Sequence, residues 1–263
     1  MLEIGTALDV GLKRRGAENQ DSLLVVEPTM LSRKPYLLIV ADGMGGYQGG
    51  ALASQTVVET LKQYYLKSKN SDDLINVLYE GVKASHQEIR RNALQSPKHS
   101  QMGSTVVAAV VDEDMLYLVN VGDSRAYLIN GERIEQINWD HSLLADELRN
   151  NRLTPEQARD YPRKNVLTLS ISAQRAELEP FTLKRRLDPE DHVLLCSDGL
   201  WGVVDEAQIK AVVMQLPAQR AARKLVDLAN ANQGPDNIAI IIARRSGKFE
   251  SSVDAETRRL PGS

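Results

Sequence analysis

Five aspartates stand where an apolar segment of strand length ends or begins. Three of them follow such a segment, in YLLIVA-DGMGG, LYLVNV-GDSR and VLLC-SDG, and two precede one, in NQDS-LLVV and GPDN-IAIIIA. An ionised carboxylate at the end of a buried strand is costly unless it is paired, and Lys or Arg does not regularly accompany these turns. If the strand ends converge, the carboxylates need a counter-charge. These aspartates are Asp21, Asp42, Asp123, Asp198 and Asp236.

Divalent cations could supply that counter-charge. Mg²⁺ and Mn²⁺ prefer oxygen ligands, and the lack of His and Cys in these turns disfavours zinc. Gly43 would offer a backbone carbonyl with no side chain in the way, and the glycines at 45 and 46 permit a positive φ. Two metals about 3.5–4 Å apart can activate a water for in-line displacement at phosphorus. A single turn of this kind is ordinary turn chemistry, but the set of five indicates phosphoester chemistry.

The elements that would position these aspartates are mainly strands. Apolar runs of strand length recur along the chain, and two of them are separated only by the acidic turn at 112–114. Strands joined by short polar turns are typical of antiparallel hairpins. The predicted strands cover residues 36–41, 106–111, 115–121, 126–129, 193–196 and 238–243.

Helical periodicity appears in other segments. Residues 50–66 and 72–93 each carry an apolar stripe, and a third helical region, 205–232, is interrupted at Pro217. The order of strands and helices is not a strict βαβ alternation, so it predicts an α+β fold with antiparallel sheets and helices packed outside. Residues 141–175 are polar and predict a long excursion with one or two short helices.

The aspartates also bear on domain organisation. They extend from position 21 to position 236, so residues 1–245 are expected to fold as one domain, followed by a disordered tail at 246–263. The chain has 263 residues, with 35 acidic and 32 basic ones and a formal net charge of −3. That balance argues against a nucleic-acid binder with a broad basic face.

The same sequence also predicts the compartment in which the protein works. No apolar run approaches the length of a membrane span, and the N-terminus places its acids early and its basic residues late, the reverse of a signal peptide. Cys196 is the one cysteine, which excludes a disulfide framework, and it is expected to be a buried small residue rather than a nucleophile. A cytoplasmic, reducing environment is the expectation.

Several motif blocks now occur together and in order. The blocks ENQDS, VADGMGGYQGG, GST, NVGDSRAYLI, DHS, LLCSDGLWGVV and PDNIAIII resemble, over residues 4–244, the metal-dependent protein phosphatases of type 2C (the PPM family) in their bacterial form. The resemblance implies two packed antiparallel β-sheets flanked by α-helices, a four-layer αββα sandwich. It also implies hydrolysis of phosphoserine and phosphothreonine by a water that bridges two Mg²⁺ or Mn²⁺ ions, with no phosphoenzyme.

The resemblance assigns roles to single residues. Asp42 matches the aspartate that bridges the two metals, and Gly43 matches the glycine whose carbonyl ligates one of them. Asp198 and Asp236 match the ligands of the other metal, so that Asp42, Asp198 and Asp236 together would hold the attacking water. The implied partners are phosphorylated proteins and a serine/threonine kinase whose phosphorylation is reversed, with the enzyme acting as a monomer.

Further roles follow in the same way. Asp21 matches an acidic residue that reaches a metal mainly through water, and Asp123 would build a third, weaker metal site with Asp198. Residues 141–175 correspond to the flap that shapes substrate access in this family.

The sequence departs from the family pattern at several positions. Gln20 stands where the first motif often has Glu, and Met44 where eukaryotic members have a His. The position of the phosphate-binding arginine is Gly16, so Arg15 or Arg14 must take that role. Past the flap, the stretch 165–172 lacks the arginine and closing glycine of the family pattern.

Two alternatives stay open at this point. The glycines at 43, 45 and 49 fit a loose dinucleotide-binding pattern, which leaves the other aspartate turns unexplained. A pseudophosphatase that docks a partner would keep the fold, and the altered stretch at 165–172 leaves room for it. Among other charged residues, Arg125 is expected to pair with a carboxylate inside the fold, and His86 and His192 are expected to be solvated.

Overall fold

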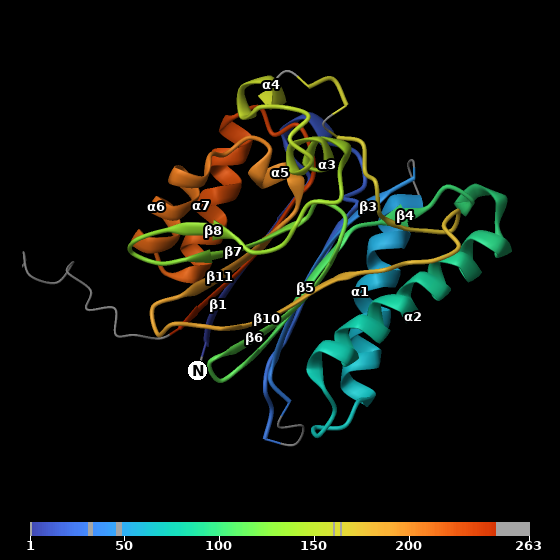
Figure 1. Ribbon diagram of the computed structural model, residues 1–263, viewed down its shortest axis with the longest axis horizontal. Coiled ribbons are helices and arrows are strands. Elements are labelled where there is room, and N and C mark those ends of the chain that lie inside the picture. The colour runs from blue at the N-terminus through green and yellow to red at the C-terminus, as the bar shows by residue number, and fades with distance from the viewer. Residues whose placement is uncertain (1, 31–33, 46–48, 160, 164, 246–263) are drawn as a thin grey trace, which may run out of the picture.

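Two antiparallel β-sheets packed face to face form the centre of the molecule (Figure 1). The computed structural model describes residues 2–30, 34–45, 49–159, 161–163 and 165–245. The tail predicted at 246–263 lies outside the described residues.

The first sheet brings together the two ends of the described chain. Its first and last strands pair in antiparallel register from Leu2 opposite Arg245 to Asp9 opposite Ile238. The strand order is β1 (Leu2–Asp9), β12 (Ile238–Arg245), β11 (His192–Cys196), β7 (Arg125–Ile129) and β8 (Ile134–Gln136).

The second sheet is built around β3, the strand that leads into the DGMGG turn. On one side β3 pairs with β5 and, further along, with the short β4, and on the other side with β2, all antiparallel. The strand order is β10 (Phe181–Arg186), β6 (Met115–Val121), β5 (Val106–Asp112), β3 (Tyr36–Met44), β4 (Gly103–Ser104) and β9 (Ile171–Ser172), with β2 (Asp21–Val26) beside β3.

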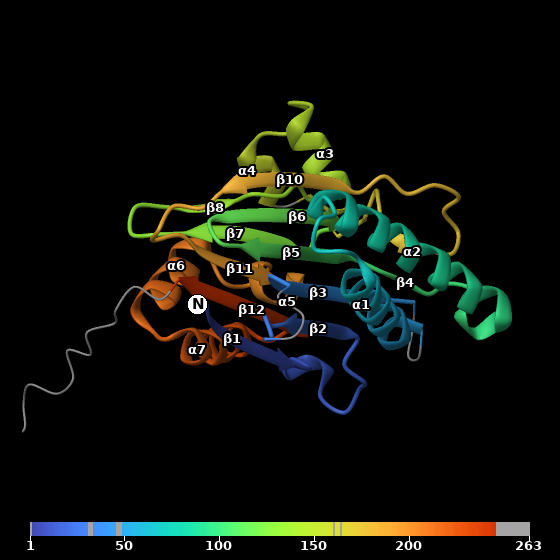
Figure 2. The same ribbon diagram turned by 90° about the horizontal axis from the view of Figure 1, so that it is seen from below.

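Helices cover the outer face of each sheet (Figure 2). Local sequence sets several of their starts: the carboxylates of Asp73 and Asp205 accept hydrogen bonds from the amides of Ile75 and Gln208, as expected of N-cap residues. Over the second sheet lie α1 (Gly49–Lys67) and α2 (Leu74–Gln95), and over the first lie α5 (Asp198–Trp201), α6 (Glu206–Gln215) and α7 (Ala218–Ala231). Short 3-10 helices occupy Leu12–Arg14 and Pro97–His99.

The side chains of β3 show how the layers are held together. Leu37 and Ile39 are fully buried in the cluster formed with α1 and α2, whereas Leu38 and Val40 are fully buried in the cluster between the two sheets. Successive side chains of a strand point to opposite faces, so a strand that is apolar at every position needs cover on both sides. The same holds for β12 between the sheet interface and α7. The predicted α+β fold with four αββα layers is confirmed.

The polar excursion begins after β8 and returns at β9. It contains α3 (Leu143–Arg149) and α4 (Pro155–Arg159), as predicted. Ser142 caps α3, its hydroxyl accepting a hydrogen bond from the amide of Ala145. None of the described helices combines the length and the apolar character that crossing a bilayer requires.

Three expectations differ from the structure. The sequence patterns did not predict β1 or β10, which carry alternating or charged residues rather than continuous apolar runs. His86 is 5% exposed, with its Nε2 3.0 Å from the carbonyl oxygen of Ser172, and His192 is 6% exposed in β11. The prediction that both histidines are solvated was wrong, because polar sequence neighbours do not reveal which face of a helix or strand is covered.

Candidate metal centre

The first two aspartates face each other across a pair of neighbouring strands. Asp21 opens β2, and Asp42, near the end of β3, is its direct cross-strand partner. The backbone of Asp42 is held by Thr105, whose hydroxyl accepts from the Asp42 amide at 3.0 Å and whose amide donates to the Asp42 carbonyl at 2.8 Å. The GST block therefore fixes the position of Asp42.

The next two aspartates come from the other sheet. Asp198 follows β11 and Asp236 precedes β12, and because these strands are antiparallel neighbours, both residues lie at the same end of the sheet. Ser197 joins this sheet to the other: its hydroxyl donates to Asp21 Oδ2 at 2.6 Å and accepts from the amide of Ala239 at 2.9 Å.

A second set of contacts holds Asp236. Its Oδ1 accepts from the amide of Asn237 at 2.8 Å. The side chain of Asn237 ties three segments together, because its Oδ1 accepts from the Gln20 amide at 2.8 Å and its Nδ2 donates to the carbonyl of Val10 at 2.9 Å. The loop after β1, the start of β2 and the turn before β12 are thereby held in one arrangement.

Asp123 lies at the edge of the same group. It is 8% exposed, and its carbonyl oxygen accepts a hydrogen bond from the indole of Trp201 at 3.0 Å. The neighbouring Arg125 pairs instead with Asp140, at 2.7 Å between Nη2 and Oδ2, and lies 3.6 Å from the centre of the Trp201 ring. The expectation that Arg125 pairs with an internal carboxylate is confirmed.

The electrostatics show that the five carboxylates converge. Burial raises the pKa of Asp21 to about 8, with Asp198 and Asp236 adding to the rise, and burial together with Asp198 raises the pKa of Asp123 to about 7. Burial and the charge of Asp236 raise the pKa of Asp198 to about 6. Burial, then Asp21 and Asp198, raise the pKa of Asp42 well above its usual range. Shifts of this direction mean that the protein alone does not neutralise the charge of these groups.

The donor set suits a hard cation. Its charged side chains are all carboxylates, which favour Mg²⁺ or Mn²⁺ over zinc. Asp198 Oδ1 is buried and has no hydrogen-bond partner among the described residues, and a buried unpaired acceptor needs a ligand. No group of three or more His, Cys, Asp or Glu among the described residues is arranged as a finished metal site. The charges of Asp21 and Asp198 act on Asp42 more strongly than those of Asp123 and Asp236.

The backbone at Gly43 is closely packed. Its amide donates to the Gln20 carbonyl at 3.0 Å, and the first turn of α1 lies against it. A Cβ added at Gly50 would lie 2.8 Å from the Gly43 carbonyl oxygen and 2.7 Å from Cδ of Gln20. Only a residue without a Cβ at position 50 therefore leaves room for the Gly43 carbonyl.

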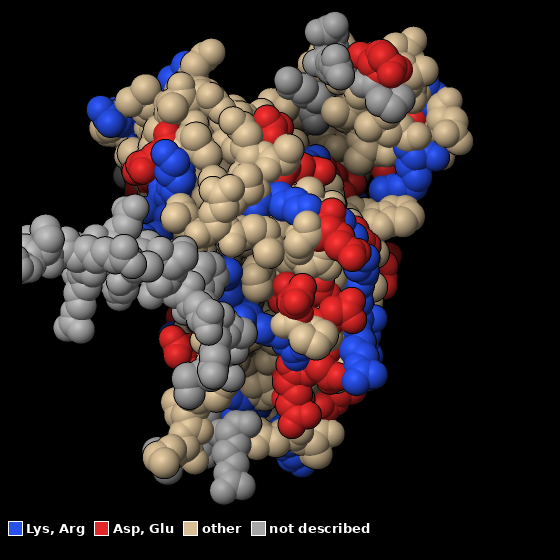
Figure 3. All heavy atoms as spheres, turned by 90° about the vertical axis from the view of Figure 1, so that its left-hand side faces the viewer, with Lys and Arg blue, Asp and Glu red and all other residues tan. Residues whose placement is uncertain are grey.

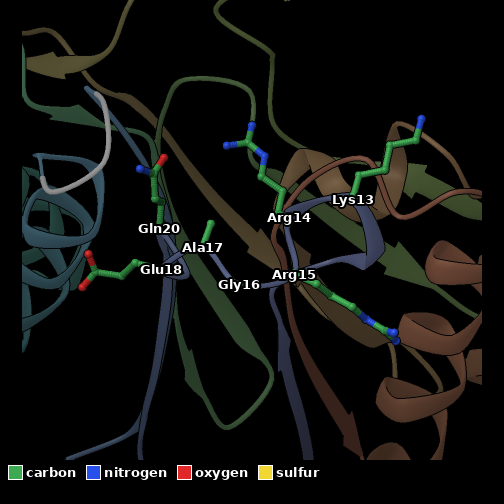
Figure 4. A pocket seen from close by; sticks show the side chains of 7 residues that line it. All are labelled: Lys13, Arg14, Arg15, Gly16, Ala17, Glu18 and Gln20. Atoms are coloured by element: carbon green, nitrogen blue, oxygen red, sulfur yellow. The ribbon is translucent and has the colours of Figure 1, made fainter.

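The loop at 11–20 carries arginine side chains close to the aspartates. A cavity of about 600 Å³ is lined by residues 13–18 and 20, and Figure 4 shows Arg14 and Arg15 leaving this loop in opposite directions. Arg14 Nη2 lies 2.9 Å from Asp236 Oδ2. Of the two arginines considered from the sequence, Arg14 is the one that the structure brings to an aspartate of the group.

Comparison with known proteins agrees with this geometry. The family model described as protein phosphatase 2C matches residues 11–230. The chain belongs to the protein phosphatase 2C family. It is 34% identical over 247 residues to protein phosphatase PhpP of Streptococcus pneumoniae, covering 92% of this chain and 96% of that protein.

Solved structures of this family have the same fold. Serine/threonine phosphatase Stp1 from Staphylococcus aureus has a TM-score of 0.86 at 31% identity, covering 94% of this chain and 96% of that one. The catalytic domain of the phosphatase PstP, solved in complex with two manganese ions, has a TM-score of 0.81 at 30% identity, covering 92% of this chain and 97% of that one. The resemblance read from the sequence blocks is confirmed, and the chain is a protein phosphatase of this family.

Sequence reasoning missed the residues that hold the aspartates. Thr105, Ser197 and Asn237 were quoted only as letters within the GST, SDG and PDN blocks. For Ser197 and Asn237 the available sign was their place directly beside Asp198 and Asp236, since buried carboxylates need donors. Thr105 is 63 positions from Asp42 and carried no such sign.

Proposed function

We propose that the chain is a Mg²⁺- or Mn²⁺-dependent serine/threonine protein phosphatase that hydrolyses phosphoserine and phosphothreonine in proteins. The observation that carries this proposal is the grouping of five aspartates from both sheets, with raised carboxyl pKa values at Asp21, Asp42, Asp123 and Asp198. Asp198 Oδ1 is also buried without a hydrogen-bond partner among the described residues. Manganese in the PstP catalytic domain, a relative of the same fold, supports the choice of metal.

The proposed ligands are those assigned from the motifs. Asp42, on which the charges of Asp21 and Asp198 act, would help to hold both ions, with the Gly43 carbonyl as a ligand of one and Asp198 and Asp236 as ligands of the other. When bound, the ions would supply a water for in-line attack and neutralise charge on the phosphoryl oxygens. Asp21 would act mainly through water. Asp123 would form a third, weaker site with Asp198, whose charge it already feels.

The thiol of Cys196, the one cysteine, is not suited to form a phosphoenzyme. Cys196 is fully buried in β11, and burial raises the pKa of its thiol. A buried thiol with a raised pKa is a poor nucleophile. Direct hydrolysis by water is therefore the proposed route.

Arg14 is the proposed phosphate ligand. Its guanidinium already binds a carboxylate oxygen of Asp236, and Arg is suited to bidentate binding of phosphate oxygens. Arg15 extends away from Arg14 (Figure 4).

Arg14→Ala is expected to raise KM for a phosphothreonine peptide about tenfold or more, since a hydrogen bond to a charged group contributes about 1.5–3 kcal/mol. Arg15→Ala, which removes the same charge from the adjacent position, should change KM less than threefold. Steady-state kinetics with Mn²⁺ measure both. The opposite order of the two effects would assign the phosphate to Arg15.

Gly50→Ala is expected to weaken metal binding, because the added Cβ would press on the Gly43 carbonyl and on Gln20. Changes next to metal ligands typically cost about 10–100-fold in affinity or activity, so the Mn²⁺ concentration for half-maximal activity should rise at least about tenfold. Gly49→Ala is the matched control, because its Cβ would meet only Met102 Cβ at 3.5 Å. Equal effects of the two alanines would show that the Gly43 carbonyl is not a ligand.

The proposal also covers the substrates of the enzyme and its place in the cell. The expected substrates are phosphorylated proteins, including those of a serine/threonine kinase, and the enzyme is proposed to act as a cytoplasmic monomer. On the face shown in Figure 3, acidic and basic side chains are interspersed, so this face offers no broad basic surface for nucleic acid.

The test is a phosphatase assay with three substrates: p-nitrophenyl phosphate, a phosphothreonine peptide and the matching phosphotyrosine peptide. Hydrolysis of the first two should require Mn²⁺ or Mg²⁺, should stop with chelator and should return when excess metal is added. Activity that chelator leaves unchanged would overturn the metal mechanism. A preference for the phosphotyrosine peptide would overturn the serine/threonine assignment.

A further inference from the structure

A second cavity, of about 360 Å³, opens beside the aspartate cluster. Its apolar wall comes from three separate segments: Leu144 and Leu148 of α3, Trp201 and Val203 at and just after α5, and Pro235 in the turn before β12. Figure 1 shows α3 and α5 at the same end of the molecule, and residues of both helices line the cavity. The cavity thus lies between the flap and the main body of the fold.

The leucines of α3 are not used by the core. Both are only partly buried, and neither belongs to the hydrophobic clusters that the described residues form. They stand one turn apart on the helix, so they share a face, and that face is directed to the cavity. An aliphatic face that packs against nothing in the core is available to a ligand.

This cavity adjoins the proposed active site. Asp198 and Asp236 line it together with the apolar residues. A phosphorylated substrate peptide whose phosphoryl group reaches these aspartates therefore places a side chain close in its sequence against the apolar wall. Since an extended residue advances about 3.3 Å, that side chain belongs to a residue within about two positions of the phosphorylated one.

The charges in the lining select against an acidic neighbour. Arg125 is paired with Asp140 and stacked on Trp201, so its charge is compensated within the protein. Arg125 is the one basic residue in the described lining, so an acidic side chain would find no unpaired cation there, whereas an apolar one would cover the leucine face.

We propose that this cavity, which we call the α3–α5 pocket, binds a large apolar side chain next to the phosphorylated residue and so makes the enzyme select phosphoproteins with an apolar flanking residue. The inference rests on the proposed phosphatase function. It assigns to Leu144 and Leu148 the role of specificity residues.

The experiment is a peptide scan. Phosphothreonine peptides in an alanine-rich host carry Leu, Ala or Asp at one of the positions −2, −1, +1 and +2, and kcat/KM is measured with Mn²⁺. At one position or more, Leu is expected to exceed Ala about tenfold, the scale of selectivity of an apolar pocket, and Asp is expected to fall below Ala. Leu148→Ser should bring the Leu/Ala ratio close to 1.

Leu94→Ser provides the matched control. Leu94 is 88% exposed near the end of α2, far from the pocket in sequence and in fold, and its replacement should leave the Leu/Ala ratio unchanged. Because the readout is a ratio between two substrates of one variant, a general loss of activity does not affect it. Thermal unfolding of each variant checks the fold.

The outcomes separate the two proposals. Hydrolysis of p-nitrophenyl phosphate and of all peptides at similar rates, or a Leu/Ala ratio that survives Leu148→Ser, would overturn the pocket inference and leave the phosphatase function standing. Failure of the wild-type protein to hydrolyse any of these substrates with Mn²⁺ would overturn the proposed function and the pocket inference together.

Discussion

Replacing Asp42 with asparagine should lower kcat/KM for a phosphothreonine peptide by about a thousandfold. Asp42 is the centre of the cluster, because its pKa is raised by burial and by the charges of all four other aspartates. A metal centre contributes several kcal/mol to transition-state stabilisation, and about 4 kcal/mol corresponds to a thousandfold in rate. An amide cannot replace a carboxylate shared between two cations.

The fold should survive this change. Asn keeps the shape of the side chain, and the backbone contacts of Asp42 to Thr105 do not depend on the carboxylate. Removing one of several repelling charges should raise the melting temperature measured in chelator. Asp227→Asn, at an exposed site on α7, is the charge-matched control and should retain full activity. A variant at Asp42 that keeps wild-type activity would show that this residue holds no metal.

The aspartate positions were predictable because each one ends or precedes an apolar run, and the family blocks gave their order. Three of the strands beside them were predictable for the same reason, since β3, β11 and β12 are buried on both faces and mainly apolar. What the sequence could not provide is the contact across the two sheets. The bond from Ser197 to Asp21 joins residues 176 positions apart, and a local pattern carries no information on such a pair.

The direction in which a side chain points is a second property that the sequence pattern does not predict. Arg14 and Arg15 are neighbours of the same type, and only the turn of the loop decides that Arg14 meets Asp236. β1 was missed for a related reason. Its side chains are mostly half-buried, so its apolar residues alternate weakly and its identity as a strand comes from pairing with β12.

Metal-free protein should lose stability as the pH rises from 7 to 8.5. An acid whose pKa is higher in the folded state binds more protons there than in the unfolded chain, so its contribution to stability falls as the pH rises towards the folded pKa. Asp21, with a pKa of about 8, and Asp42, whose pKa is also raised, act in this range. His86, His141 and His192 have lowered pKa values. They act below about pH 6.5 with the opposite sign, so they do not contribute to the fall from pH 7 to 8.5. The buried Cys196 thiol, whose pKa is raised, adds to that fall only towards pH 8.5.

Bound metal should reverse this trend. Metal ligands must be deprotonated, so the affinity rises with pH, and ligand at about a thousand times Kd stabilises by about 4 kcal/mol. For a chain of this size that corresponds to a rise in melting temperature of about 10 °C. The rise on adding Mg²⁺ should therefore be large at pH 8.5 and smaller at pH 6, as measured by thermal unfolding with chelator or with Mg²⁺.

The Asp42→Asn variant connects the two sets of measurements. With the central carboxylate gone, the rise in melting temperature on adding Mg²⁺ should largely disappear at every pH, and the fall with pH in chelator should become shallower. If Mg²⁺ stabilised this variant as strongly as the wild type, the ions would bind elsewhere, and the raised pKa values would describe only buried acids. Stability and catalysis would then be separate properties of the cluster. If both are lost together, the charge that makes the metal-free fold unfavourable at alkaline pH is the same charge that binds the catalytic ions.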